Sequence, residues 1–164
     1  MDMLEEQGAA KLGLRELARV VGVSPAAPYR HFDSRTALLE ALAVTGFQRF
    51  SAAITEAARA PGAASELDAM GRAYVRFALA NPNLFRLMFS PELTQSGRPN
   101  LRMAADAAFA KLRDATAKAA DGRVAALKAW AQVHGLAVLL LDGQIARRDS
   151  EDEETLIAAV IGPG

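Results

Sequence analysis

The stretch LRELARVVGVSPAAPYRHFDSRTALLEAL, residues 14–42, decides the predicted fold of this chain. Its first part predicts a short helix over residues 14–21. The apolar face of this helix comprises Leu17, Ala18 and Val21. Gly22 ends the helix, and the pair Ser24-Pro25 predicts the start of the next, because serine caps free N–H groups and proline suits the first helical position. Two short helices joined by a tight turn form a helix-turn-helix.

The second of these helices carries side chains that suit contact with DNA. Three consecutive residues offer a hydroxyl, a guanidinium and an imidazole: Tyr29, Arg30 and His31. Such groups hydrogen-bond to phosphate oxygens and base edges. Ala26 and Ala27 are small enough to let the helix approach thymine methyl groups. Arg35 lies in the first turn of the following helix, where a cation is unfavourable unless a phosphate pairs with it. Residues 11–35 hold five basic and two acidic residues, which suits a DNA-contacting head.

The rest of the chain has helical periodicity and no sustained alternation, which predicts an all-α protein. The further predicted helices span residues 1–7, 34–60, 65–80, 84–89, 101–120, 123–141 and 151–161. Gly8 and Pro61-Gly62 end two of these helices, and residues 94–100 (TQSGRPN) predict a loop. Ser150 and Glu153 have the spacing of a capping box at the last helix.

The composition restricts the class of protein. The chain has 164 residues, of which 51% are hydrophobic and 23% charged, and its formal net charge is zero. It has no cysteine, which excludes disulfides and thiolate metal sites and suits a reducing cytoplasm. The acidic start MDMLEEQ predicts no signal peptide, and the longest apolar stretch, residues 135–141, is far shorter than the ~20 residues that span a bilayer. We therefore expect a cytoplasmic protein that contacts no membrane.

An enzyme is the alternative from another class. The two histidines, His31 and His134, lie in different predicted domains. No Ser-His-Asp order, HExxH motif, phosphate-binding loop or metal-spaced cluster is present. The sequence therefore argues against an enzyme and predicts neither a metal nor a cofactor.

Residues 14–42 resemble the DNA-binding domain of tetracycline-repressor (TetR/AcrR) type regulators. The family pattern consists of an IA-like pair, a GVS turn, a variable stretch, Tyr-x-His/Tyr-Phe, Ser-Lys/Arg and a leucine pair. The matching positions here are Leu17-Ala18, Gly22-Val23-Ser24, Tyr29-Arg30-His31-Phe32, Ser34-Arg35 and Leu38-Leu39. So many matched offsets make this resemblance stronger than that of a single short motif.

The resemblance implies a helix-turn-helix head over residues 1–46 and a ligand-binding and dimerisation domain over residues 47–164. It implies phosphate contacts from three side chains, Tyr29, His31 and Arg35. Base contacts are implied for the start of the recognition helix, for Arg30 and for Arg15. The whole predicted DNA-binding set is Arg15, Ser24, Pro25, Ala26, Ala27, Tyr29, Arg30, His31 and Arg35. The sequence departs from the family at Gly13, where Ser or Thr is usual, and in a shortened first helix.

The second half carries a W-x-x-x-H-G arrangement made by Trp130, His134 and Gly135. Together with NPNLFRLMFSPE, residues 81–92, it resembles the C-terminal domain of one large TetR subgroup. The candidate lining of a ligand pocket is Tyr74, Phe77, Phe85, Met88, Met103, Phe109, Trp130 and His134. The alternative is that each of these side chains is simply core. Gly135 inside a helix costs roughly 1 kcal/mol relative to alanine, which suggests a close helix crossing or a ligand that needs room.

The last two helices carry more apolar surface than a small monomer readily buries, and the resemblance implies that they form a four-helix dimer interface. Two heads about 34–36 Å apart match successive major grooves. We therefore predict a ligand-responsive repressor that binds palindromic operator DNA as a homodimer and responds to a small apolar effector. The alternative function is a dimeric small-molecule-binding protein whose truncated head binds DNA weakly or not at all.

Overall fold

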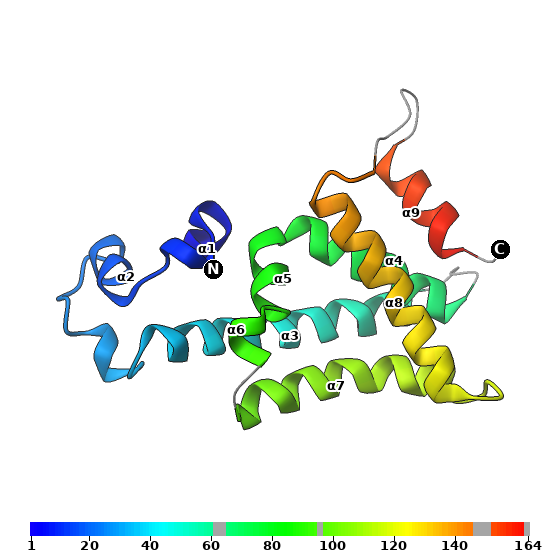
Figure 1. The fold of residues 1–164 in the computed structure, drawn as a ribbon, viewed down its shortest axis with the longest axis horizontal. Helices are drawn as coiled ribbons and strands as arrows, with labels where there is room; N and C mark the ends of the chain where they lie inside the picture. Colours follow the sequence, from blue (N-terminus) through cyan, green and yellow to red (C-terminus); the bar gives the residue numbers. More distant parts are fainter. Residues whose placement is uncertain (61–64, 95–96, 146–151, 163–164) are drawn as a thin grey trace. The chain divides into compact units, whose positions relative to one another are not determined.

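The computed structural model describes residues 1–60, 65–94, 97–145 and 152–162, and every regular element in these ranges is helical. The elements are α1 (Asp2–Gln7), η1 (Ala9–Lys11), α2 (Leu14–Val20), η2 (Pro28–Arg30), α3 (Arg35–Ala58), α4 (Glu66–Ala80), α5 (Pro82–Met88), α6 (Pro91–Thr94), α7 (Pro99–Thr116), α8 (Gly122–Leu141) and α9 (Glu153–Ile161) (Figure 1). The predicted all-α class is confirmed. The predicted break at Pro61-Gly62, part of the predicted loop over residues 94–100, and Ser150 lie outside the described residues.

Side-chain caps set several helix starts. The Ser34 hydroxyl accepts the N–H of Ala37 at 3.1 Å, so α3 begins where the sequence predicts. Asp121 caps α8 in the same way, through the N–H of Val124 at 3.0 Å. The last helix differs from the prediction, because Asp152 is its N-cap and accepts the N–H of Thr155 at 2.7 Å. The predicted start at residue 151 was therefore wrong by two residues.

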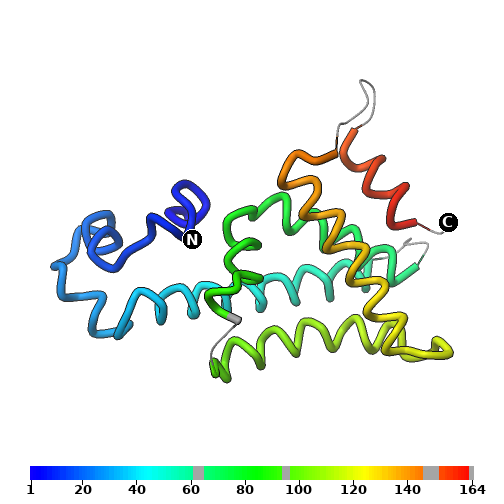
Figure 2. Tube along the Cα trace, viewed as in Figure 1, coloured from blue at the N-terminus to red at the C-terminus, as the bar shows by residue number. Residues whose placement is uncertain are grey.

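The chain forms two compact units, which do not follow the predicted division after residue 46. The first comprises Met1–Phe47 with Asn81–Ala105, and the second comprises Gln48–Ala80 with the described residues from Asp106 onward. Residues 81–105 thus belong to the same compact unit as the N-terminal residues, whereas the functional division of the chain after residue 46 stays a prediction. The reason is that α5 packs with α1, as Figure 2 shows for the blue and green segments.

The core of the first unit brings α3 and α5 into close contact. Leu84, Leu87 and Met88 of α5 are each at most 2% exposed. Gly46 of α3 makes this packing possible, because a Cβ there would lie 2.8 Å from Met88 Sδ and 2.9 Å from Leu84 Cδ1. A side chain at residue 46 would push the two helices apart.

The second unit is built around α4, which packs against α8 and α9. Gly71 lies at this crossing, where a Cβ would lie 2.7 Å from Ile161 Cγ2 and 3.3 Å from Val133 Cγ1. The outer surface of α4 is tied to α9 by an ion pair between Arg76 and Glu154, which holds the pKa of the Glu154 carboxyl below its usual range. These contacts fix α9 along α4.

Helix α8 keeps much of its apolar surface exposed. It is 20 residues long, its most apolar window has a mean hydropathy of 1.6, and 22% of that window is buried. By length and composition alone such a helix could cross a membrane, although the sequence predicted no span from its shorter uninterrupted run. Large exposed apolar side chains on it are Val124, Leu127, Val138 and Leu139. A second protein chain could equally cover this face.

Candidate nucleic-acid interface and effector region

The turn after α2 has the predicted geometry. Gly22 has φ of +72°, a left-handed conformation that glycine adopts without a steric penalty. The N–H of Val23 then bonds to the carbonyl of Ala18 at 3.0 Å, which closes the turn. Ala18 is buried as predicted, but Val21 is 57% exposed, so its predicted place on the apolar face was wrong.

The predicted recognition helix is not an α-helix. The N–H of Ala27 bonds to the carbonyl of Ser24 at 2.9 Å, and the 3-10 turn η2 follows without a side-chain cap. The cause is Pro28, because it has no N–H and stands where an α-helix would donate to the carbonyl of Ser24. The segment is therefore a series of tight turns, and the prediction of a helix capped by Ser24 was wrong.

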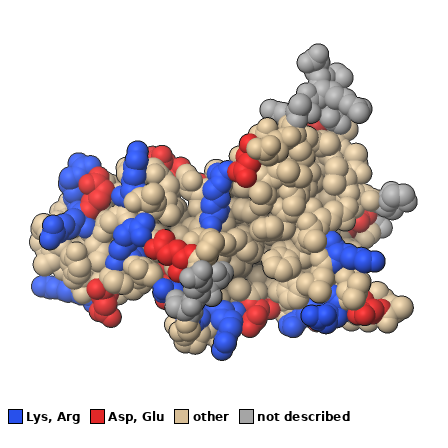
Figure 3. Space-filling model, viewed as in Figure 1, with Lys and Arg blue, Asp and Glu red and all other residues tan. Residues whose placement is uncertain are grey.

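Most of the predicted DNA-binding side chains lie at the surface of this segment. Exposed members of the set are Arg15, Ser24, Pro25, Ala26, Tyr29, Arg30 and His31. Ala27 is half-buried, and the neighbouring Pro28 is buried and anchors the segment. Figure 3 shows basic side chains over the N-terminal part of the chain with acidic ones beside them. The positive charge of Arg19 is neutralised locally, because its Nε donates to the carboxylate of Glu16 at 3.0 Å.

Arg35 has internal partners that sequence reasoning missed. Its Nε donates to the carbonyl of Leu12 at 2.9 Å and its Nη2 to the carbonyl of Ala9 at 2.6 Å. Its Nη1 lies 3.2 Å from Oε1 of Glu92. Three of the five guanidinium N–H groups are thus engaged within the first unit. The partners are 23 to 57 residues away, so no local pattern could have indicated them.

Glu5 is a second residue that sequence reasoning missed. Its carboxylate accepts the N–H of Asn83 at 3.1 Å and the N–H of Leu84 at 2.9 Å. Asn81, the N-cap residue of α5, makes no side-chain cap bond. A glutamate in α1 therefore caps a helix that begins 77 residues later, counting from Glu5 to Pro82.

The second unit contains an aromatic cluster with a hydrogen-bonded centre. The Tyr74 hydroxyl shares a hydrogen bond with Nδ1 of His134 at 2.8 Å and accepts another from Nε1 of Trp130 at 3.3 Å. Phe109 meets Trp130 edge-on, and Phe50 meets Tyr74 in the same way, with centroids 5.5 Å and 4.9 Å apart. Burial raises the pKa of Tyr74 and lowers the pKa of His134, so both side chains are held neutral.

The structure separates the predicted ligand-lining residues into two groups. Those in the second unit are Tyr74, Phe77, Phe109, Trp130 and His134. Phe85 and Met88 are 2% exposed and belong to the core of the first unit. Met103, on α7, is 67% exposed. Sequence reasoning placed these last three with the others because helical periodicity identifies an apolar face but not its partner.

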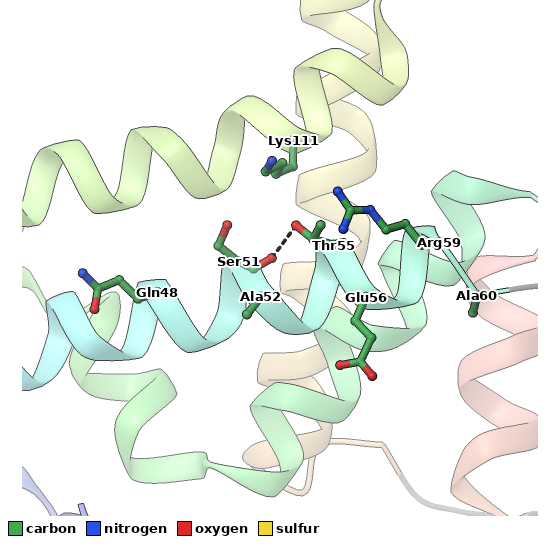
Figure 4. Close-up of a pocket in the computed structure, with 8 residues that line it drawn as sticks. All are labelled: Gln48, Ser51, Ala52, Thr55, Glu56, Arg59, Ala60 and Lys111. Atoms are coloured by element: carbon green, nitrogen blue, oxygen red, sulfur yellow. Dashed lines mark hydrogen bonds between the residues drawn. The ribbon is translucent and has the colours of Figure 1, made fainter.

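A groove of about 850 Å³ lies beside α3 and α7 and contains none of the predicted residues. Its lining is Gln48, Ser51, Ala52, Thr55, Glu56, Arg59, Ala60 and Lys111. In Figure 4 the cations of Arg59 and Lys111 extend toward the space between the two helices, whereas Glu56 points away from it. This groove is open, and six of its eight lining residues are polar or charged, unlike the aromatic cluster. Among the described residues, no group of three His, Asp or Glu side chains could hold a metal ion.

Comparison with known proteins covers both halves of the chain. Residues 1–42 match the model of bacterial regulatory proteins of the tetR family, and residues 67–162 match the model of the tetracyclin repressor-like C-terminal domain. A search of curated proteins found no match.

Several solved structures are similar over nearly the whole chain. A protein of unknown function from Rhodococcus sp. RHA1 is 34% identical with a TM-score of 0.85, over 98% of this chain and 86% of that one. The TetR family transcriptional regulator PfmR from Thermus thermophilus is 20% identical with a TM-score of 0.67, over 98% and 91%. A bacterial regulatory protein in the tetR family from Rhodococcus RHA1 is 24% identical with a TM-score of 0.64, over 96% and 86%. At those identities the last two show a shared fold.

Proposed function

Because this chain belongs to the TetR family of bacterial transcriptional regulators, we propose that it is a ligand-responsive repressor that binds a palindromic operator as a homodimer in the cytoplasm. The single observation that supports this most is the exposed polar group at the end of the recognition segment, Tyr29, Arg30 and His31. The proposal requires neither catalysis nor a cofactor.

In the proposed DNA complex, Tyr29 and His31 contact phosphates, together with the two guanidinium N–H groups of Arg35 that its internal bonds leave. Arg30 and Arg15 are exposed and reach base edges. The small surface of Ser24, Pro25, Ala26 and Ala27 lets the turn enter the groove closely. Base contacts supply preference for sequence, and phosphate contacts supply affinity and its salt dependence.

The proposed dimer forms through α8 and α9. The exposed apolar side chains of α8 are joined by Val160 of α9, which is 37% exposed. Gly135 lies in the middle of α8, and a Cβ there would meet none of the described residues within 4 Å. An outward-facing glycine lets a second copy of α8 approach its backbone closely, which would offset the cost of glycine in a helix.

The dimer is tested by placing a charge in this face. Leu139, 44% exposed, is replaced in Leu139→Lys, and Met103, an exposed apolar residue of α7 outside the face, is replaced in Met103→Lys as the control. Sedimentation should show that Leu139→Lys dissociates to a monomer while Met103→Lys remains a dimer. A dimer of unchanged stability for Leu139→Lys would refute this interface.

We further propose that a small apolar effector enters the second unit beside the aromatic cluster and shifts the dimer to a head spacing that no longer fits the operator. Trp130 is the only tryptophan of the chain, so its fluorescence reports on the cluster directly. An effector from a panel of small apolar molecules should change this fluorescence and weaken operator binding at the same concentrations. An effector that releases DNA without any change at Trp130 would place its site elsewhere.

The experiment that tests the whole proposal is fluorescence anisotropy with duplexes tiled across the DNA upstream of the gene. One duplex should bind tightly with a palindrome at its centre, and affinity should fall steeply with salt. A dimer that binds none of these duplexes at low salt would instead support the alternative of a small-molecule-binding dimer. The incomplete recognition helix is the observation that makes this alternative worth testing.

A further inference from the structure

The carboxylate of Glu5 joins α1 to α5 through both of its oxygens. Oε2 accepts the N–H of Asn83 at 3.1 Å, and Oε1 accepts the N–H of Leu84 at 2.9 Å. In return the side-chain amide of Asn83 donates to the backbone carbonyl of Glu5 at 2.7 Å. Three hydrogen bonds between two short segments allow only one relative arrangement of α1 and the first turn of α5.

The same short N-terminal stretch is tied to the recognition segment. Leu4 of α1 is 1% exposed, which anchors the helix in the first unit. The carbonyls of Ala9 and Leu12 bind the guanidinium of Arg35, which lies at the start of α3 directly after the recognition segment. One short stretch of backbone, from Glu5 to Leu12, therefore holds α5 at one end and Arg35 at the other.

We infer that Glu5 is a positioning residue that couples the first turn of α5 to operator binding by the head. This inference rests on the proposed function, because it requires that the head binds DNA. If α5 shifts, the carboxylate loses both N–H groups together, and α1 loses the contact that orients it. Coupling between two sites is reciprocal, so operator binding must in turn stabilise the first turn of α5.

The chain offers a matched control in the neighbouring glutamate. Glu6 is exposed and makes no hydrogen bond or ion pair among the described residues, whereas Glu5 is half-buried and caps α5. Glu5→Gln and Glu6→Gln each remove one negative charge from the same helix. The loss of one negative charge should strengthen attraction to DNA equally in both variants. Any difference in DNA affinity or amide exchange between them therefore measures the effect of the cap on α5.

The first measurement is amide hydrogen exchange of the free full-length protein, followed by NMR at Asn83 and Leu84. In Glu5→Gln these amides should exchange about two- to thirty-fold faster than in the wild type, the range expected for loss of a helix cap. In Glu6→Gln their rates should equal those of the wild type. Circular dichroism should show the same helix content in all three proteins. Equal exchange rates at Asn83 and Leu84 in the two variants would overturn the inference.

The second measurement repeats the exchange with the tightest-binding upstream duplex. DNA should slow exchange at Asn83 and Leu84 in the wild type and in Glu6→Gln but not in Glu5→Gln, whose affinity should fall about five-fold or more. A wild type that binds the duplex without any change at α5 would overturn this inference and leave the proposed function intact. A wild type that binds no duplex would overturn both.

Discussion

Removing the hydroxyl of Tyr74 should destabilise the second unit and leave DNA binding intact. In Tyr74→Phe, Nδ1 of His134 loses its hydrogen bond to this hydroxyl, and Nε1 of Trp130 loses an acceptor. A typical neutral hydrogen bond contributes about 0.5–1.5 kcal/mol, and the 3.3 Å bond from Trp130 belongs at the lower end. His134 and Trp130 are both half-buried, so water can replace part of each bond. We therefore expect a loss of about 1–2 kcal/mol in the free energy of unfolding.

The other tyrosine of the chain supplies the control. Tyr29 is 48% exposed and makes no hydrogen bond among the described residues, so Tyr29→Phe should change stability by less than about 0.5 kcal/mol. Thermal unfolding followed by Trp130 fluorescence should give a midpoint about 2–8 °C lower for Tyr74→Phe than for the wild type. Operator affinity should fall in Tyr29→Phe and stay unchanged in Tyr74→Phe, because only Tyr29 is proposed to contact a phosphate. Equal midpoints for Tyr74→Phe and the wild type would refute the role given to this hydroxyl.

Four further outcomes are expected for other residues. Burial lowers the pKa of His134, so the unfolded state binds more protons than the folded state below about pH 6.5. The free energy of unfolding, measured by urea titration, should therefore fall as the pH drops from there toward the folded-state pKa. A urea midpoint that does not change with pH would contradict this. Gly71→Leu should destabilise by about 1–3 kcal/mol, because its side chain must displace Ile161, and calorimetry with an unchanged midpoint would disprove this crossing. Arg30→Ala should alter sequence preference, and Arg35→Ala should weaken binding to every duplex and also lower the midpoint of unfolding; an Arg30→Ala variant with the wild-type preference profile would remove Arg30 from the base-reading set.

The order and class of the elements could be predicted because helix formation is decided locally. Periodic apolar residues, the Ser34 cap and the left-handed Gly22 act within a few residues of their own position. The matched offsets from Leu17 to Leu39 are also sufficient by themselves to indicate the family. Even so, Pro28 carried a local signal against an α-helix, and the capping pattern at Ser24 was wrongly given more weight.

What only the tertiary structure decided are the contacts between residues far apart in the chain. Glu5 accepts the N–H of Asn83, 78 residues away, and Arg35 reaches Glu92 across 57 residues, although nothing around either residue distinguishes it from an ordinary surface charge. Likewise, the apolar face of α5 predicts burial, but its packing against α1 and α3 places Met88 in the core of the first unit. Periodicity determines which side of a helix is buried. The partner of that side depends on close packing among all the helices, which no single stretch of sequence contains.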